Sequence, residues 1–138
     1  MSQANVEIVR GVYEAAVERD GAAVFGAYDP DIEVDASRIE LGGLVGQPIR
    51  RGHEGARSFF RDLHDAFDNL HYDLSELIDA GEDHVVSVVT RRGRGRTSGI
   101  EVELTVALLW TLGNAKVRRI VWFPTREEAV QAVPRRAR

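Results

Sequence analysis

Residues 100–123, IEVELTVALLWTLGNAKVRRIVWF, contain the clearest pair of strands in the chain. From residue 100 to residue 112 apolar side chains recur with period two, which is the spacing of a β-strand. Near the end of this strand both alternating sets are apolar, so we expect both of its faces to be partly buried. Gly113 and Asn114 form a turn signal before Lys116–Phe123, so the two strands are predicted to pair antiparallel.

Two more strands are predicted upstream of this hairpin, over residues 70–78 and 85–92. A turn at residues 80–83 joins them, and a longer, glycine-containing turn at residues 93–99 leads into the strand at 100–112. Because no helical pattern interrupts these four strands, they are expected to pair in sequence order. The longer turn is strongly basic. We interpret the four arginines in this turn and at the end of the strand before it as a solvated hairpin tip, because no aromatic residues are interleaved with them: Arg91, Arg92, Arg94 and Arg96.

Helical periodicity predicts two core helices. The first carries an apolar stripe made of Val6, Val9, Tyr13, Ala16 and Val17. The second runs over about residues 54–68, with an apolar stripe made of Phe59, Phe60, Leu63 and Phe67. The first helix therefore buries a tyrosine, and the second is rich in phenylalanine.

Shorter elements fill the rest of the chain. Asp20 can cap a short helix that carries Val24, Phe25 and Tyr28, and residues 32–35 alternate as a short strand that ends at Asp35. Residues 36–52 lack periodicity and form a long loop, which we interpret as a candidate lid. A capping box starting at Thr125 predicts a last helix. The predicted order is α-α-β-α-β-β-β-β-α, in a single domain over residues 1–134 with a basic tail at 135–138.

Composition excludes several classes of function. The 138 residues are 43% hydrophobic and 29% charged, which is ordinary for a globular domain, and they include no cysteine, so no disulfide or thiol chemistry is available. The net charge of −4 gives no electrostatic reason to expect a nucleic acid or an anionic membrane as partner. Without a secretory signal or a run of roughly 18 apolar residues, a cytoplasmic location is expected. No histidine and carboxylate spacing is typical of a metal site, and no cofactor is predicted.

The order of elements and four short segments resemble the nuclear transport factor 2-like superfamily, and within it the SnoaL-like and ketosteroid isomerase-like branches. The segments are residues 9–16 (VRGVYEAA), 31–35 (DIEVD), 52–55 (GHEG) and 122–129 (WFPTREEA). The resemblance covers nearly the whole chain and implies an α+β, cystatin-like cone, in which a curved antiparallel sheet wraps around the N-terminal helices. Proteins of this shape include isomerases, cyclases, dehydratases, epoxide hydrolases and non-catalytic binders, so the shape does not select an activity.

The resemblance to ketosteroid isomerases implies roles for Tyr13 and Asp35. In those enzymes a tyrosine of the first helix donates to an oxyanion, and an aspartate that ends the first strand moves the proton between carbons. The second oxyanion donor of the family is an aspartic acid on the penultimate strand, where hairpin register places Ala107. The strand pattern adds an open alternative for Asp35, because Ile32 and Val34 share the face expected to turn inward and Asp35 lies on the other.

The remaining candidate site residues are predicted to line a cavity inside the cone. Its walls are expected from the second core helix and the last strands, with two polar residues beside the long loop: Phe59, Phe60, Leu63, Ala107, Trp122, Arg51 and His53. The fitting ligand is a small apolar molecule with a carbonyl group. Because one sheet face is rich in valine, leucine and tryptophan, a homodimer that covers this face is expected.

Two functions remain open on this basis. The leading hypothesis is a small-molecule enzyme, an isomerase, cyclase or dehydratase that works by acid–base proton transfer through Tyr13 and Asp35. The alternative is a non-catalytic module of the same fold that binds a small ligand or assembles as a dimer, and Ala107 in place of a second acid favours it. Nucleic-acid binding through the arginine hairpin is a third reading, which the acidic net charge disfavours.

Overall fold

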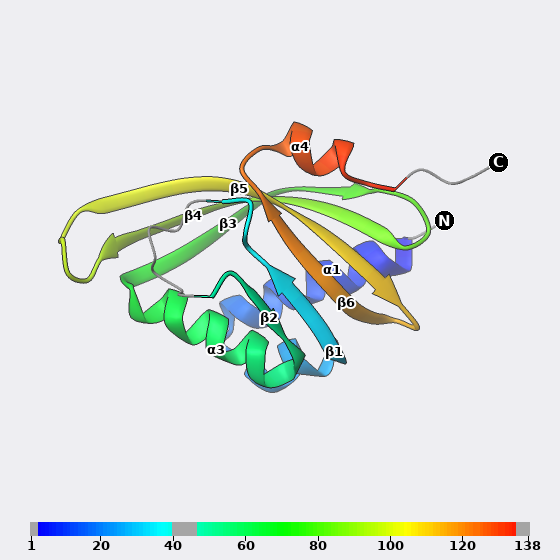
Figure 1. The fold of residues 1–138 in the computed structure, drawn as a ribbon, viewed down its shortest axis with the longest axis horizontal. Helices are drawn as coiled ribbons and strands as arrows, with labels where there is room; N and C mark the ends of the chain where they lie inside the picture. Colours follow the sequence, from blue (N-terminus) through cyan, green and yellow to red (C-terminus); the bar gives the residue numbers. More distant parts are fainter. Residues whose placement is uncertain (1–2, 40–46, 135–138) are drawn as a thin grey trace.

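The computed structural model describes residues 3–39 and 47–134, and in them a curved six-stranded sheet carries helices on both of its faces (Figure 1). The helices are α1 (Gln3–Val17), α2 (Gly21–Gly26), α3 (Gly52–Asp65) and α4 (Arg126–Gln131). The strands are β1 (Tyr28–Asp35), β2 (Ile49–Arg51), β3 (Phe67–Asp79), β4 (His84–Gly95), β5 (Glu101–Gly113) and β6 (Lys116–Phe123). Residues 40–46 of the loop interpreted as a lid, and the basic tail, lie outside the described residues.

The sheet has the order β2-β1-β6-β5-β4-β3 and is mixed rather than purely antiparallel. The strands β3, β4, β5 and β6 form the predicted antiparallel series. However, β1 runs parallel to β6, with Val34 opposite Ile120. The sequence argument for antiparallel pairing holds only for consecutive strands joined by short turns, and β1 is not such a neighbour of β6. The strand β2, which pairs with β1, lies in the segment predicted as loop.

The first strand begins earlier than predicted. The sequence pattern placed Tyr28 in the preceding helix. In the structure α2 already ends at Gly26, and Tyr28 is the first residue of β1. Asp20 caps α2 as predicted, since its carboxylate accepts from the amide of Ala23. The pairing of β1 with β6 is irregular between Tyr28 and Glu33. Pro30 lies in that interval and has no amide proton to donate, so regular alternation is visible only from residue 32 onward.

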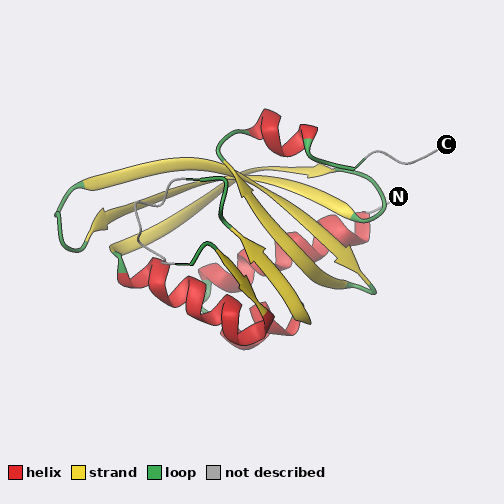
Figure 2. Ribbon diagram, viewed as in Figure 1, coloured by secondary structure: helices red, strands yellow, loops and turns green. Residues whose placement is uncertain are grey.

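The main core fills the concave side of the sheet, where α1 and α3 pack (Figure 2). The helix α3 ends at Asp65, three residues before the predicted end, and Phe67 opens β3. Phe59 of α3 and Trp122 of β6 are fully buried, with ring centroids 5.4 Å apart. Ile32 and Val34 of β1 join the same cluster, which fixes the inward face of that strand.

A smaller apolar cluster lies on the opposite, convex side of the sheet, under α4. Ala129 of this helix packs over residues of β4, β5 and β6, namely Val86, Ala107, Leu109, Val121 and Phe123. Farther along β4 and β5, cross-strand ion pairs replace apolar contacts, as in Arg92 with Glu103 and Arg94 with Glu101. The apolar face on which the homodimer expectation rests is thus partly covered by α4, and the dimer stays a prediction. Among the described helices, none has the length and apolar character needed to cross a membrane.

Candidate functional site

A cavity of about 350 Å³ lies inside the cone, between α1, α2, α3 and the concave face of the sheet. Its walls are mainly apolar and consist of Val12, Ala16, Val24, Phe25, Phe60, Leu108, Trp110 and Ile120. Its polar lining groups are Tyr13, Tyr28, His64, Tyr72 and Arg91. The exposed turn between α1 and α2 adds Arg19, Asp20 and Gly21 at the rim. An apolar chamber with a few polar groups is the usual form of a small-molecule site.

Tyr13 is held in this cavity by a buried hydrogen-bond chain. Its hydroxyl lies 2.9 Å from Ser87 Oγ on β4, and Trp110 Nε1 donates to the same oxygen over 2.8 Å. The Tyr13 ring also meets the Trp110 ring edge-on, with centroids 5.7 Å apart. Burial raises the pKa of Tyr13 above its ordinary value of 10, although the nearby Arg91 charge and the Ser87 hydrogen bond act in the opposite direction. Tyr13 is therefore a neutral hydrogen-bonding group near neutral pH.

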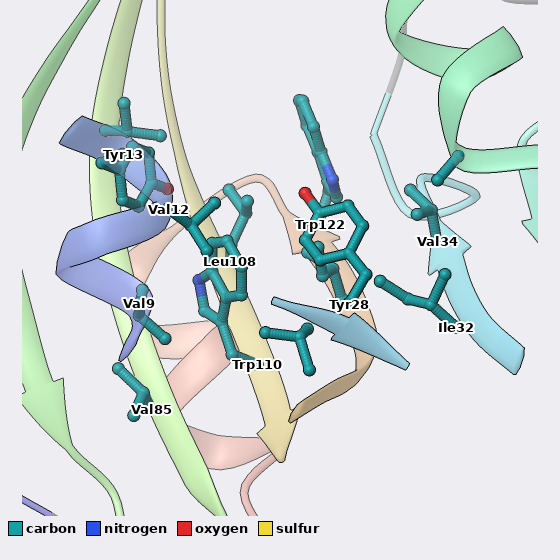
Figure 3. Close-up of a cluster of buried hydrophobic side chains, with 14 of the residues drawn as sticks. Val9, Val12, Tyr13, Tyr28, Ile32, Val34, Val85, Leu108, Trp110 and Trp122 are labelled. Atoms are coloured by element: carbon teal, nitrogen blue, oxygen red, sulfur yellow. The ribbon is translucent and has the colours of Figure 1, made fainter. Parts of the chain in front are cut away.

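Tyr28 is the second buried phenol of the cavity. In Figure 3 it comes from β1 and Tyr13 from α1, and Leu108 and Trp110 of β5 lie between them. Burial also raises the pKa of Tyr28 far above 10. Both phenols keep their protons at neutral pH, so each can act as a donor but not as a base.

Arg91 is the least expected member of the site. It was predicted to lie in a solvated hairpin tip, yet the residue is only 8% exposed. Successive strand residues face opposite sides, so Arg91 shares the inward face of β4 with Val85, Ser87 and Val89. Its guanidinium carbon lies 4.4 Å from the ring centroids of both Tyr72 and Trp122.

The charge of Arg91 has no anionic partner in the described part of the chain. Its Nε and Nη1 atoms are buried and donate to no hydrogen-bond acceptor there, and the only other buried side-chain nitrogen or oxygen without a partner in that part is Trp122 Nε1. Desolvating an ion costs several kcal/mol in real proteins, whereas each cation–π contact returns only about 0.5–2 kcal/mol. Because arginine keeps its proton even when buried, the cavity carries a fixed positive charge.

His64 and Tyr72 form a second polar pair at the cavity, with His64 Nε2 2.8 Å from the Tyr72 hydroxyl. His64 as a whole is exposed, but partial burial of its ring, together with the charges of Arg91 and Arg19, lowers its pKa below 6.5. The imidazole is therefore mostly neutral at pH 7. A neutral imidazole can accept a proton, which the two buried phenols cannot.

Asp35 does not join Tyr13. It points to the convex side of β1, opposite to Val34, and is absent from the described lining of the cavity. Its Oδ1 accepts from the Ser37 amide over 2.9 Å and from the Ser37 hydroxyl over 2.6 Å, while Oδ2 lies 3.7 Å from Arg119. The strand alternation of Ile32 and Val34 thus determines its direction. The carboxylate holds the turn after β1 rather than facing a ligand.

The structure places the other predicted wall residues in different surroundings. Phe60 lines the cavity, whereas Phe59 is buried in the core beside it. Leu63 and Trp122 line a separate small apolar pocket of about 30 Å³, which Arg91 also lines. Ala107 lies under α4 on the convex side, because the inward positions of β5 are those of Leu108 and Trp110.

The two predicted polar residues beside the long loop also lie outside the cavity lining described here. Arg51 is exposed and forms an ion pair with Glu33 over 3.3 Å. The ring of His53 lies 3.0 Å from the carbonyl oxygen of Tyr28 and packs near Phe25. His53 thus contacts two residues that line the cavity, Tyr28 and Phe25, without lining it itself. Among residues 3–39 and 47–134, no three histidine or acidic side chains converge in a way that could hold a metal ion.

Comparison with known proteins identifies the fold. A model of the SnoaL-like domain matches residues 9–120. A nuclear transport factor 2-like protein of unknown function from Burkholderia pseudomallei is 23% identical, with a TM-score of 0.76 over 98% of this chain and 100% of the other. A Mesorhizobium loti protein described as a SnoaL-like polyketide cyclase is 17% identical, with a TM-score of 0.70 over 89% of this chain and 99% of the other.

A third structure shows a relative with a bound ligand. It is a Mycobacterium tuberculosis protein in complex with estradiol-17beta-hemisuccinate, 11% identical, with a TM-score of 0.69 over 87% of this chain and 92% of the other. At these identities the likeness concerns the fold. No curated protein matches the sequence significantly.

Proposed function

The chain belongs to the SnoaL-like domain family, and from this premise we propose that it binds a compact apolar carbonyl compound in the cone and transfers a proton on it. The observation that carries the proposal is the Tyr13 hydroxyl, which lines an apolar cavity and is held by Ser87 and Trp110. A preorganised donor in a site with little water stabilises a developing oxyanion more strongly than water does. The steroid ester bound by one fold relative supports a small organic ligand in such a cone.

The direction of the hydrogen bonds favours donation by Tyr13. An indole N–H can only donate, so Ser87 Oγ accepts from Trp110 and still has its own proton. When that proton is donated to Tyr13 Oη, the phenol is free to donate its proton to a ligand in the cavity. Each donor in such a chain polarises the next, which strengthens the last bond.

The proton acceptor in this proposal is His64, hydrogen-bonded to Tyr72, in place of Asp35. Both residues line the same cavity as Tyr13, and the pKa of His64 lies below 6.5. The lowered pKa keeps the imidazole in its basic form at neutral pH. Asp20, at the rim, is already engaged as the cap of α2.

Non-catalytic binding in the same cavity is the second candidate. The observation that favours it is the position of Asp35, which is turned away from the cavity and bonded to Ser37. On this reading the cavity holds a metabolite, and Tyr13 fixes its orientation. Both candidates share the binding step and differ only in whether a proton moves.

Deuterium exchange distinguishes the two candidates without knowledge of the natural substrate. Small cyclic ketones are incubated with the protein in D₂O, and exchange of the hydrogens next to the carbonyl is followed by proton NMR. Proton transfer predicts exchange that is slowed tenfold or more by Tyr13→Phe and by His64→Gln. Binding that is unaccompanied by exchange, or exchange that is equal in the parent and in both variants, would support the binding module instead.

A cavity-filling variant tests the binding step itself. Ala16 lines the cavity, so Ala16→Phe should weaken ligand binding, as measured by NMR line broadening of the ketones. Ala132→Phe is the matched control, because Ala132 is an exposed residue at the end of α4, on the other side of the sheet. Equal binding by both variants would place the ligand outside the cone.

A further inference from the structure

Arg91 differs from the other arginines of its hairpin in having no carboxylate partner. Arg94 lies 3.0 Å from Glu101, Arg96 lies 3.0 Å from Asp68, and Arg92 lies 2.8 Å from Glu103. The side chains of those three arginines are about half exposed, so water solvates their charges and they need an ion pair least. The buried arginine, where a partner is needed most, has none among the described residues.

The groups around Arg91 do not compensate its charge. The described lining of the cavity contains a second cation, Arg19, and one carboxylate, Asp20, which accepts from the Ala23 amide at the start of α2. The remaining titratable groups of the lining are His64 and three tyrosines, none of which supplies a carboxylate: Tyr13, Tyr28 and Tyr72. A chamber with apolar walls and a net positive lining favours a ligand of negative charge.

The faces and the edge of the guanidinium have different surroundings. Tyr72 and Trp122 lie at 4.4 Å from its central carbon, as expected for rings that stack on a cation. The N–H bonds of a guanidinium lie in its plane, and this edge has the geometry to bind two oxygens at once. Nε and Nη1 lack acceptors, and so does the neighbouring Trp122 Nε1. The buried side-chain donors that lack a partner among the described residues therefore all belong to two residues in contact, Arg91 and Trp122.

We propose that Arg91 anchors the anionic oxygen group, a carboxylate or an enolate, of an apolar ligand that fills the cone. This inference rests on the proposed binding function and narrows its ligand class to organic acids with an apolar body. The oxygen group binds at the guanidinium, and the body lies against Phe60, Leu108 and Ile120. In this position the charge of Arg91 also stabilises an enolate that forms from a neutral ketone.

Two fluorescent probes that share one aromatic body test the anchor. The compound 8-anilinonaphthalene-1-sulfonate carries an anionic group, and N-phenyl-1-naphthylamine has the same aromatic body without it. The parent protein should bind the sulfonate at least tenfold more tightly in fluorescence titrations. Arg91→Met should remove about tenfold or more of the sulfonate affinity and leave that of the neutral probe nearly unchanged, because a bond to a charged group is lost. Arg91→Lys should retain more of the affinity than Arg91→Met.

Arg92→Met is the matched control. Arg92 is the next residue of β4 and faces the convex side of the sheet, so this variant loses the same charge outside the cavity and should bind both probes as the parent does. An Arg91→Met protein with the parent's circular dichroism and the parent's sulfonate affinity would overturn the anchor. A parent that prefers the neutral probe would overturn it as well, whatever the variants do. If instead Ala16→Phe leaves the binding of both probes unchanged, the cone is not the binding place and the proposed function fails.

Discussion

Removal of the Ser87 hydroxyl should destabilise the protein far more than an ordinary serine-to-alanine change. Ser87 is fully buried, and its oxygen is the common partner of Tyr13 and Trp110. Each intramolecular hydrogen bond contributes about 0.5–1.5 kcal/mol, and a buried donor left without a partner costs about 1–3 kcal/mol. Tyr13 and Trp110 both line the cavity, so water there can replace part of the loss. We therefore expect Ser87→Ala to lower the free energy of unfolding by about 2–4 kcal/mol.

The assay is urea unfolding at 25 °C, followed by far-ultraviolet circular dichroism and analysed as a two-state transition. Ser75→Ala is the control, because Ser75 is exposed on β3 and donates only to the Val88 carbonyl. Its expected effect is within about 0.5 kcal/mol. A double-mutant cycle with Tyr13→Phe should show a coupling of about 0.5 kcal/mol or more. Equal effects of Ser87→Ala and Ser75→Ala, or strict additivity in the cycle, would refute the reasoning.

Three further predictions concern the core, the pH dependence and the last helix. Ile32→Ala leaves a cavity at a fully buried position of β1 and should lower the free energy of unfolding in urea by about 2–5 kcal/mol. Ile49→Ala on the exposed strand β2 is the control and should lower it much less. Similar losses in the two variants would contradict the described core. Partial burial lowers the pKa of His64 and of His84 below 6.5, so the unfolded chain takes up protons first. Stability should be full above pH 6.5 and fall as the pH drops through the folded-state pKa values. In urea midpoints measured from pH 7.5 to 5, His64→Gln should make this dependence on pH less steep. An unchanged slope in the His64→Gln, His84→Gln double variant would count against both pKa shifts. Thr125→Ala removes the side-chain cap of α4 and should cost about 1 kcal/mol by thermal or urea unfolding, and no measurable loss would show that the cap is not used.

Local pattern predicted most of the fold. The alternation from residue 100 onward and the Gly113-Asn114 turn gave β5 and β6 within a residue at each end. The parallel pairing of β1 with β6 could not be derived in that way, because it joins segments far apart in the chain with no turn between them. The resemblance to the family supplied the cone, which local periodicity does not specify.

The candidate site was only partly accessible to the same reasoning. Tyr13 followed from the apolar stripe of α1, and it lines the cavity. The alternation of β1 already indicated that Asp35 faces away from Val34, and the analogy with isomerases argued the opposite. Arg91 was grouped with its charged neighbours, although period-two alternation from Val85 through Val89 places it on the inward face. The convergence of Arg91, Tyr72 and Trp122 depends on strand register, which the sequence does not show.

The parallel contact between β1 and β6 also has a consequence for the order in which the chain folds. Hairpins from β3 to β6 close over short loops, whereas Glu33 and Arg119, which meet across the β1–β6 edge, are 86 positions apart. Contacts at such separation pay a larger loop-closure entropy and dominate slow folding. We therefore expect the meander to assemble first and β1 to dock late. Since β1 contributes Tyr28 to the cavity, the binding chamber is complete only at the end of folding, and a bound ligand slows unfolding more than it speeds folding.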